Sequence, residues 1–161
     1  MRKTYIVNIK NINKAWQRLE KRTKYDIRKC DKKVYETNDI KYFNDLHKIT
    51  RPDRIVGLDY IVNLYQSFLP DCRLYSTGTA TVMVGWKEGI GYYLMAARDK
   101  TQKNDKSPSK VLWEAFKSLS KRGVRSIDLC GANVDSIAKF KRGFGGKLVN
   151  YKSEKICRGQ I

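Results

Sequence analysis

Three short runs rich in β-branched and aromatic residues follow one another between residues 72 and 97. They are CRLYS, TATVMVGW and GIGYYLMAA, and only the short stretches TG and WKEG separate them. Runs of this length and composition are typical of strands, and connections this short join antiparallel neighbours. The sequence therefore predicts an antiparallel meander of three strands in the middle of the chain.

The C-terminal part predicts alternating helices and strands. After a polar loop over 98–106, Ser107 and Pro108 have the chemistry of a helix N-cap and a first helical residue. That helix ends near Gly123. A buried-type strand VRSIDLC, a short helix SIAKFKR and a final pair of strands, KLVNY and SEKIC, follow. A meander, a strand-helix-strand unit and a hairpin indicate an α+β fold around one mixed, mostly antiparallel sheet flanked by helices.

The N-terminal part supplies a strand and a basic helix ahead of this pattern. TYIVNI at 4–9 predicts the strand, and the apolar spacing over 12–30 predicts one helix. A short strand KVYETN and two helices, which end near Pro52 and Pro70, complete the order. With no internal repeat and no linker, we expect a single domain over 1–161, in which 1–32 form the N-terminal strand and basic helix and 33–161 the core.

Basic residues are concentrated in three segments. Lys and Arg number 34 against 16 Asp and Glu, a net charge of +18. Residues 10–33 carry ten basic and three acidic side chains, 98–125 nine and three, and 139–158 seven and one, whereas 55–97 carry two and three. Such an excess favours nucleic acid, an anionic membrane surface or a phosphorylated substrate as partner, although a lysine-rich surface also serves solubility. If the three segments meet on one face, that face can follow a phosphate backbone.

Cysteine and histidine usage argues against a metal site and against a Cys-His nucleophile. Cys30, Cys72, Cys130 and Cys157 form no C-x-x-C pair, and His47, the only histidine, lies on the apolar side of a predicted helix. The sequence has no signal peptide and no window apolar enough to span a bilayer. We therefore expect reduced thiols in a cytoplasmic protein.

The order of elements resembles the GNAT acyltransferase fold, and the stretch from residue 107 to 151 is similar to the second half of a FemABX-type domain. That stretch is SPSKVLWEAFKSLSKRGVRSIDLCGANVDSIAKFKRGFGGKLVNY. The shared features are a helix with a Trp-Glu-Ala core, a Gly before a strand that ends in Asp and then Gly, and Phe-Lys followed by Phe-Gly-Gly. WQRLEKRTKYDIRKC (16–30) also resembles the basic helix that this family places ahead of a GNAT unit.

The resemblance implies a transferase. FemABX enzymes add amino acids to peptidoglycan precursors and take the acyl group from aminoacyl-tRNA. It therefore implies aminoacyl-tRNA as co-substrate, a small-molecule or peptide amine as acceptor, and no bound cofactor. Family members usually contain two such domains in tandem, whereas this chain has room for one.

The loop over 98–106 helps to distinguish an acyl-CoA donor from aminoacyl-tRNA. Acyl-CoA enzymes of the GNAT fold hold pyrophosphate in a loop whose glycines let backbone N–H groups approach the phosphates, and this loop contains no glycine. An anionic donor would instead be held by long side chains and the start of the next helix. The candidate donor-binding residues here are Arg98, Lys100, Lys103, Lys106, Ser107 and Lys110. The alternative is a solvated charged connection.

The resemblance also points to the residues near the reacting ester. It places Lys141 beside the aminoacyl end of the tRNA, as a cation that stabilises the tetrahedral oxyanion, and Phe140 as a stacking surface or as simple core. Asp128 either orients a substrate ammonium or bonds local backbone N–H groups. Tyr92 and Tyr93 lie on the strand that lines the acyl site in this fold, and alternation places one toward the site and the other in the core.

The sequence leaves two questions open. The base that takes the proton from the acceptor amine could be Asp128, Glu114, a bound water or a group of the substrate. An acyl-CoA donor on the same fold remains the first alternative function, and an RNA-binding domain without catalysis is the second.

Overall fold

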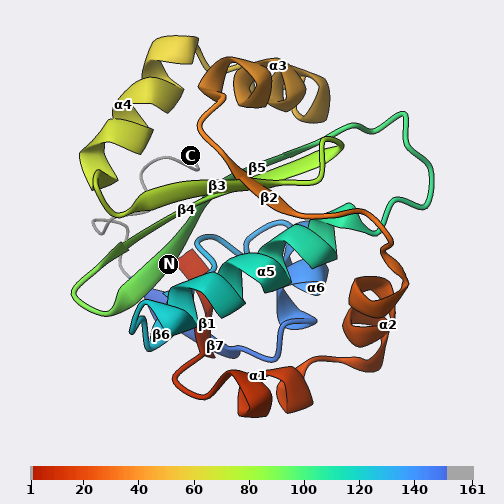
Figure 1. The fold of residues 1–161 in the computed structure, drawn as a ribbon, viewed down its shortest axis with the longest axis vertical. Coiled ribbons are helices and arrows are strands. Elements are labelled where there is room, and N and C mark those ends of the chain that lie inside the picture. Colours follow the sequence, from red (N-terminus) through yellow and green to blue (C-terminus); the bar gives the residue numbers. More distant parts are fainter. Residues whose placement is uncertain (1, 152–161) are drawn as a thin grey trace.

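The structure is a computed structural model that describes residues 2–151. Its elements follow the predicted order, except that two helices replace the one predicted over 12–30, and the predicted last strand lies outside the described residues (Figure 1). In chain order they are β1 (Arg2–Asn8), α1 (Ile12–Arg18), α2 (Lys21–Lys29), β2 (Tyr35–Thr37), α3 (Ile40–Thr50), α4 (Leu58–Phe68), β3 (Cys72–Ser76), β4 (Ala80–Lys87), β5 (Ile90–Arg98), α5 (Ser107–Lys121), β6 (Ser126–Asp128), α6 (Asp135–Arg142) and β7 (Lys147–Tyr151).

The strands form one seven-stranded sheet in the order β2-β3-β4-β5-β6-β1-β7. The predicted meander of β3, β4 and β5 is confirmed, and every neighbouring pair is antiparallel except β5 with β6. The first strand of the predicted final pair is present as β7, and it pairs with β1. The segment 153–157, expected to be its partner, lies outside the described residues. The N-terminal strand thus completes the sheet between β6 and β7.

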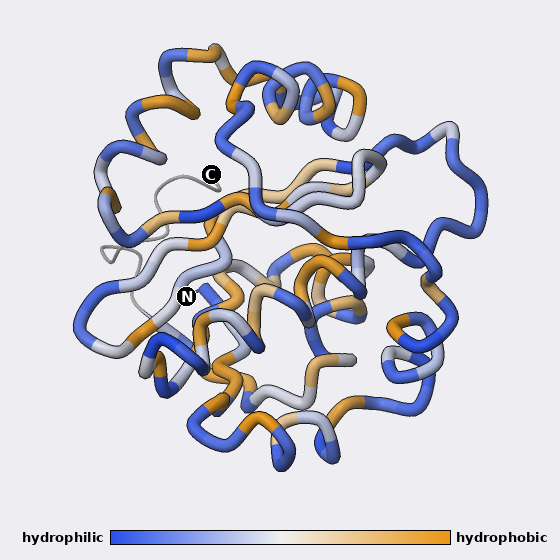
Figure 2. Tube along the Cα trace, in the orientation of Figure 1, coloured by the Kyte–Doolittle hydropathy of each residue, from blue (hydrophilic) through white to orange (hydrophobic). Residues whose placement is uncertain are grey.

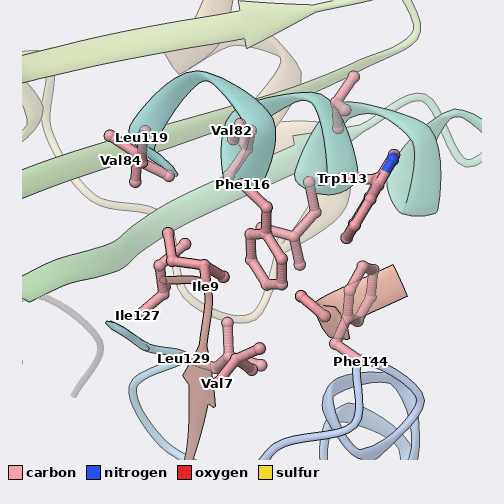
Figure 3. Close-up of a cluster of buried hydrophobic side chains, with 14 of the residues drawn as sticks. Val7, Ile9, Val82, Val84, Trp113, Phe116, Leu119, Ile127, Leu129 and Phe144 are labelled. Carbon is pink, nitrogen blue, oxygen red and sulfur yellow. The ribbon is translucent and has the colours of Figure 1, made fainter. Parts of the chain in front are cut away.

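Helices cover both faces of the sheet. Figure 1 shows α3 and α4 on one face and α5, with α1, α2 and α6, on the other. The larger core lies under α5, where side chains from α5, β1, β4 and β6 meet (Figure 3). Its fully buried members include Val7, Ile9, Val84, Phe116, Leu119, Ile127, Leu129 and Phe144. Each such side chain contributes about 1.5–3 kcal/mol through its removal from water.

The predicted basic helix over 12–30 is two helices, α1 and α2, because Leu19 and Glu20 adopt extended backbone conformations between them. The turn that follows α6 occupies this break. The backbone N–H of Glu20 donates to the Gly143 carbonyl at 2.9 Å, and Arg142 pairs with the Glu20 carboxylate at 3.4 Å. A contact with a distant segment of the chain therefore interrupts the helix. The spacing of apolar residues along the sequence does not predict such a contact.

Gly143 and Gly145, on either side of Phe144, are required by close packing. Gly145 has φ +73°, and a Cβ there would clash with the backbone carbonyl of Arg18. A Cβ on Gly143 would clash with the Thr23 hydroxyl. Phe144 is fully buried between these two positions. The turn therefore holds α6 directly against α1 and α2.

Two glycine substitutions test this close approach. Gly145 and Gly123 both have positive φ, but a Cβ at Gly123 would meet no atom within 4 Å. We expect Gly145→Ala to lower the free energy of unfolding by roughly 2–4 kcal/mol, through backbone strain plus overpacking, and Gly123→Ala by about 1 kcal/mol, through strain alone. Urea denaturation measures both. Equal losses would show that the turn after α6 has room to move.

Candidate active site

The candidate site lies where β5 and β6 part. These two strands pair only from Ile90 to Tyr92, opposite Ser126 to Asp128, and β5 then continues to Arg98. The chain leaves β6 through Leu129, Cys130 and Gly131, and both Cys130 and Gly131 have positive φ. The splayed strands and this bend bring together the predicted residues Lys141, Asp128 and Tyr93.

Lys141 is buried, with 2% of its surface exposed. Helix α6 directs its side chain into the protein, where Nζ donates to the carbonyl of Cys130 and, at 2.8 Å, to that of Gly131. The ammonium also lies 5.0 Å from the centre of the Tyr93 ring, a distance typical of a cation–π contact. Lys141 therefore fixes the bend that follows β6.

The environment of Lys141 shifts its pKa. Burial lowers the pKa of the ammonium to about 7, and the negative charge of Asp128 opposes this shift in part. The two carbonyls supply acceptors for the protons that water would otherwise bind. The group therefore exchanges its proton within the physiological pH range, which is unusual for a lysine.

Asp128 is half-buried at the end of β6. Its Oδ1 accepts hydrogen bonds from the Thr4 hydroxyl at 2.5 Å and from the backbone N–H of Cys130 at 2.8 Å. The local backbone bond that the sequence suggested is thus present. Thr4, from β1, is a site residue that sequence reasoning missed, because only the sheet order places it beside β6.

The two tyrosines of β5 face opposite sides of the sheet, as strand alternation predicts. Tyr93 packs with the larger core and lies against Lys141, whereas Tyr92 packs on the other face, with its ring 5.8 Å from that of Phe68. Burial raises the pKa of both phenols, and the charges of Asp128 and Glu88 add to the effect at Tyr92. Tyr93 is therefore the one that faces the proposed site.

Phe140 has a packing role in this structure. It is partly buried and lies edge-on to Phe144, with ring centres 5.4 Å apart. Phe144 in turn packs against Phe116 of α5 at 5.4 Å. Of the two interpretations of Phe140, this arrangement favours the core.

The cations of the 98–106 loop do not converge on one point. The loop runs out from the molecule and is hydrophilic along most of its length (Figure 2). Arg98, Lys100 and Lys103 are exposed on it. Lys106 lies over the ring of Tyr25, 5.9 Å from its centre. Lys110 pairs instead with Glu114 on α5, at 3.6 Å.

Ser107 does not offer its hydroxyl to a ligand in this structure. The side chain is fully buried, and Thr79 donates to its Oγ at 3.3 Å. The N-cap of α5 is Lys106, one residue earlier than predicted. The backbone N–H of Ser107 donates to the Asp105 carboxylate at 3.0 Å, and Asp105 also pairs with Lys32 at 3.3 Å. An acidic side chain therefore occupies the start of α5, where the sequence predicted an anionic donor.

Glu114, one of the candidate bases, lies away from Lys141. It pairs with Lys117 at 2.7 Å and lines a shallow hollow of about 260 Å³ between α5 and the β2 edge, together with Glu36 and Tyr75. Of the two side chains predicted as bases, Asp128 is therefore the one near Lys141.

The remaining predictions concern thiols, metals and membranes. Cys30 and Cys72 are free, whereas Cys130 is disulfide-bonded, so the prediction of reduced thiols is wrong for Cys130. Cys157 lies outside the described residues. In the part of the chain from 2 to 151, no group of three or more His, Cys, Asp or Glu side chains could hold a metal ion. In the same part, every helix is too short or too polar to cross a bilayer.

Comparison with known proteins identifies the fold. No protein-family model and no curated protein matches the sequence. A crystal structure of FemX matches with a TM-score of 0.80 and 13% identity, over 92% of this chain and 60% of FemX. A GCN5-related N-acetyltransferase from Sphaerobacter thermophilus matches with a TM-score of 0.59 and 12% identity, over 92% of this chain and 49% of that one. L-PGS from Bacillus licheniformis matches with a TM-score of 0.57 and 8% identity, over 91% and 57%.

These likenesses show a GNAT-type fold similar to that of FemX, as the sequence predicted. The chain spans only 49% to 60% of the length of these three structures. At such low identities the likeness concerns the fold and does not carry the activity with it.

The pKa of Lys141 predicts how stability changes with pH. Below about pH 7 the folded and unfolded chains both carry the proton, so the full cost of the buried charge is present. Between this value and the ordinary 10.5, the unfolded chain binds a proton that the folded chain lacks, so stability rises with pH. Relative to Lys141→Met, the wild-type protein should gain about 3 kcal/mol in free energy of unfolding from pH 6.5 to 9.5.

Urea denaturation at the two pH values measures this difference. The matched control is Lys139→Met, which removes an exposed lysine of the same helix and should show no such trend. A constant difference between wild type and Lys141→Met would mean that burial does not perturb the ammonium.

Proposed function

We propose that this protein is an acyltransferase that moves an aminoacyl group from aminoacyl-tRNA to an acceptor amine. The observation that carries the proposal is a buried ammonium, Lys141, at the point where β5 and β6 part in a FemX-like fold. The FemABX resemblance supplies the donor, and the net charge of +18 suits a polyanion. The acceptor is a small-molecule or peptide amine, and the reaction requires no bound cofactor.

The reaction needs placement and charge stabilisation more than a nucleophile. The neutral acceptor amine attacks the ester carbonyl, a C–N bond forms, the C–O bond to the ribose breaks, and the proton that the nitrogen loses goes to the ribose oxygen. The negative charge that develops on the carbonyl oxygen is stabilised by a nearby cation in a low-dielectric surrounding. Lys141 is enclosed, so its charge acts on the carbonyl oxygen of the ester from behind the bend at Cys130 and Gly131. Its hydrogen bonds to the carbonyls of these two residues also hold the bend in position.

Asp128 is suited to hold the acceptor. Its Oδ1 is engaged by Thr4 and by the backbone of Cys130, which fixes the orientation of the carboxylate. A carboxylate held in this way attracts the acceptor while it is still an ammonium. The same carboxylate can accept the proton that the ammonium must lose before its nitrogen can attack.

The start of α5 favours tRNA over coenzyme A. A compact pyrophosphate needs free N–H groups at a helix N-terminus, and the N–H of Ser107 already donates to Asp105. The carboxylate of Asp105 would also repel a phosphate placed there. Exposed side chains such as Arg98, Lys100 and Lys103 can instead follow a long polyphosphate.

Retention on immobilised tRNA and on coenzyme A, side by side, tests the donor. We expect retention on tRNA that weakens steeply with salt, and little retention on coenzyme A. Transfer of a radiolabelled amino acid from tRNA to a small amine then tests catalysis. Binding of tRNA without transfer would favour a non-catalytic RNA-binding domain, and retention on coenzyme A alone would favour an acyl-CoA enzyme.

Lys141 can be tested separately from tRNA binding. We expect Lys141→Met to lower kcat by on the order of 100-fold and to change the Kd for tRNA by less than about threefold, because the charge acts on the transition state. The control, Lys139→Met, should leave kcat unchanged. Single-turnover assays below the melting temperature of each variant make the comparison, and normal turnover of folded Lys141→Met would remove Lys141 from the mechanism.

A further inference from the structure

Helix α2 exposes cations around one aromatic ring. The outward side chains, all exposed, are Lys21, Arg22, Tyr25, Arg28 and Lys29. Tyr25 is 49% exposed, and Arg22 lies over its ring, 5.7 Å from the centre. Lys106, from the loop before α5, lies over the same ring at 5.9 Å. Two segments far apart in the sequence thus place cations on one tyrosine.

Neighbouring cations of α2 are also held by aromatic contact. Arg28 lies over the Trp16 ring at 5.1 Å, and Trp16 packs on Trp113 of α5, also at 5.1 Å. A guanidinium on an aromatic face is oriented but not neutralised, so its N–H groups remain suited to phosphate. One carboxylate also belongs to this helix, because Asp26 pairs with Arg22 at 3.2 Å and offsets part of its charge.

The position of α2 connects this face to the proposed site. The turn after α6, the helix that carries Lys141, packs on Thr23 of α2. Lys32, just beyond α2, pairs with Asp105 at the start of α5. Helix α2 therefore contacts the turn after α6 with its buried side, while Tyr25 on its outward side meets Lys106 of the loop 98–106.

We propose that the outward face of α2, together with Lys106, is an RNA-binding surface that contacts the phosphates and one unstacked base near the end of the donor. This proposal rests on the proposed function, because it names the surface that holds the tRNA of that reaction. The cations bind phosphates, and Tyr25 offers an exposed aromatic ring to a base.

An anionic membrane is the less suitable partner for this face. A helix that lies in a bilayer surface inserts an apolar side opposite its cations. The apolar side of α2 is occupied, since Thr23 and Ile27 are buried inside the protein and α2 packs against α5. The exposed side chains of α2 are four cations and Tyr25, and the partly exposed Asp26 is paired with Arg22. This excess of positive charge suits a polyanion in water.

Binding of uncharged tRNA over a series of salt concentrations tests the surface without requiring catalysis. We expect Lys21→Glu/Lys29→Glu to weaken binding by about 10- to 100-fold and to reduce the dependence of log K on log salt, because phosphate contacts are lost. The control Lys41→Glu/Lys87→Glu makes the same change in net charge at exposed sites on α3 and at the end of β4. It should weaken binding by less than about threefold.

Tyr25 separates stacking from charge. We expect Tyr25→Ala to weaken tRNA binding by about tenfold with the salt dependence unchanged, and Tyr25→Phe to bind nearly as wild type. Circular dichroism is the check that each variant is folded.

Equal effects of the two charge-reversed pairs on tRNA binding would overturn the proposal, because net charge alone would then explain binding. If Lys21→Glu/Lys29→Glu lost binding to phosphatidylglycerol vesicles but still bound tRNA as the wild type does, the proposal would also be overturned.

The outcomes also distinguish this proposal from the proposed function. Wild-type protein that binds tRNA through α2 but transfers no amino acid would support the surface and contradict the enzyme. Protein that transfers amino acid normally after Lys21→Glu/Lys29→Glu would support the enzyme and contradict the surface.

Discussion

The buried ammonium of Lys141 is the interaction on which the candidate site depends. Within residues 2–151 it forms no ion pair with a carboxylate, and its protons are bound by the carbonyls of Cys130 and Gly131. A charge removed from water in this way is costly unless its surroundings replace the lost hydration. The carbonyls, the Tyr93 ring and the nearby Asp128 supply that replacement. The bend after β6, helix α6 and strand β5 are therefore joined at one point.

The same segment links the site to the basic N-terminal helices. The turn after α6 fits the break between α1 and α2 because glycine removes the side chains that would clash there. Phe144 anchors this turn in the main core, and Lys141 anchors the helix before it. The structure thus accounts for the composition of the stretch from 139 to 146. Its glycines allow close packing on α1 and α2, its two phenylalanines pack on each other, and one of its three cations, Lys141, is buried.

Local patterns predicted those features that depend on near neighbours in the chain. The meander followed from three β-type runs with short connections, and the opposite facing of Tyr92 and Tyr93 followed from strand alternation. The break at Leu19, the place of β1 between β6 and β7, and the burial of Ser107 depend on contacts between distant segments, which periodicity cannot report. A lysine in a polar run is usually exposed, so the enclosure of Lys141 could not be predicted either.

The central claim is that Lys141 carries its titrating ammonium inside the protein, at the junction of β5, β6 and α6. The most direct measurement is an NMR titration of protein labelled with ¹³C at lysine Cε, with Lys141→Arg used to assign the signal. The account predicts one resonance that titrates near pH 7, the value that burial gives this lysine, and that is missing in the variant. A Lys141 resonance that titrates with the surface lysines, near their ordinary value of about 10.4, would contradict it.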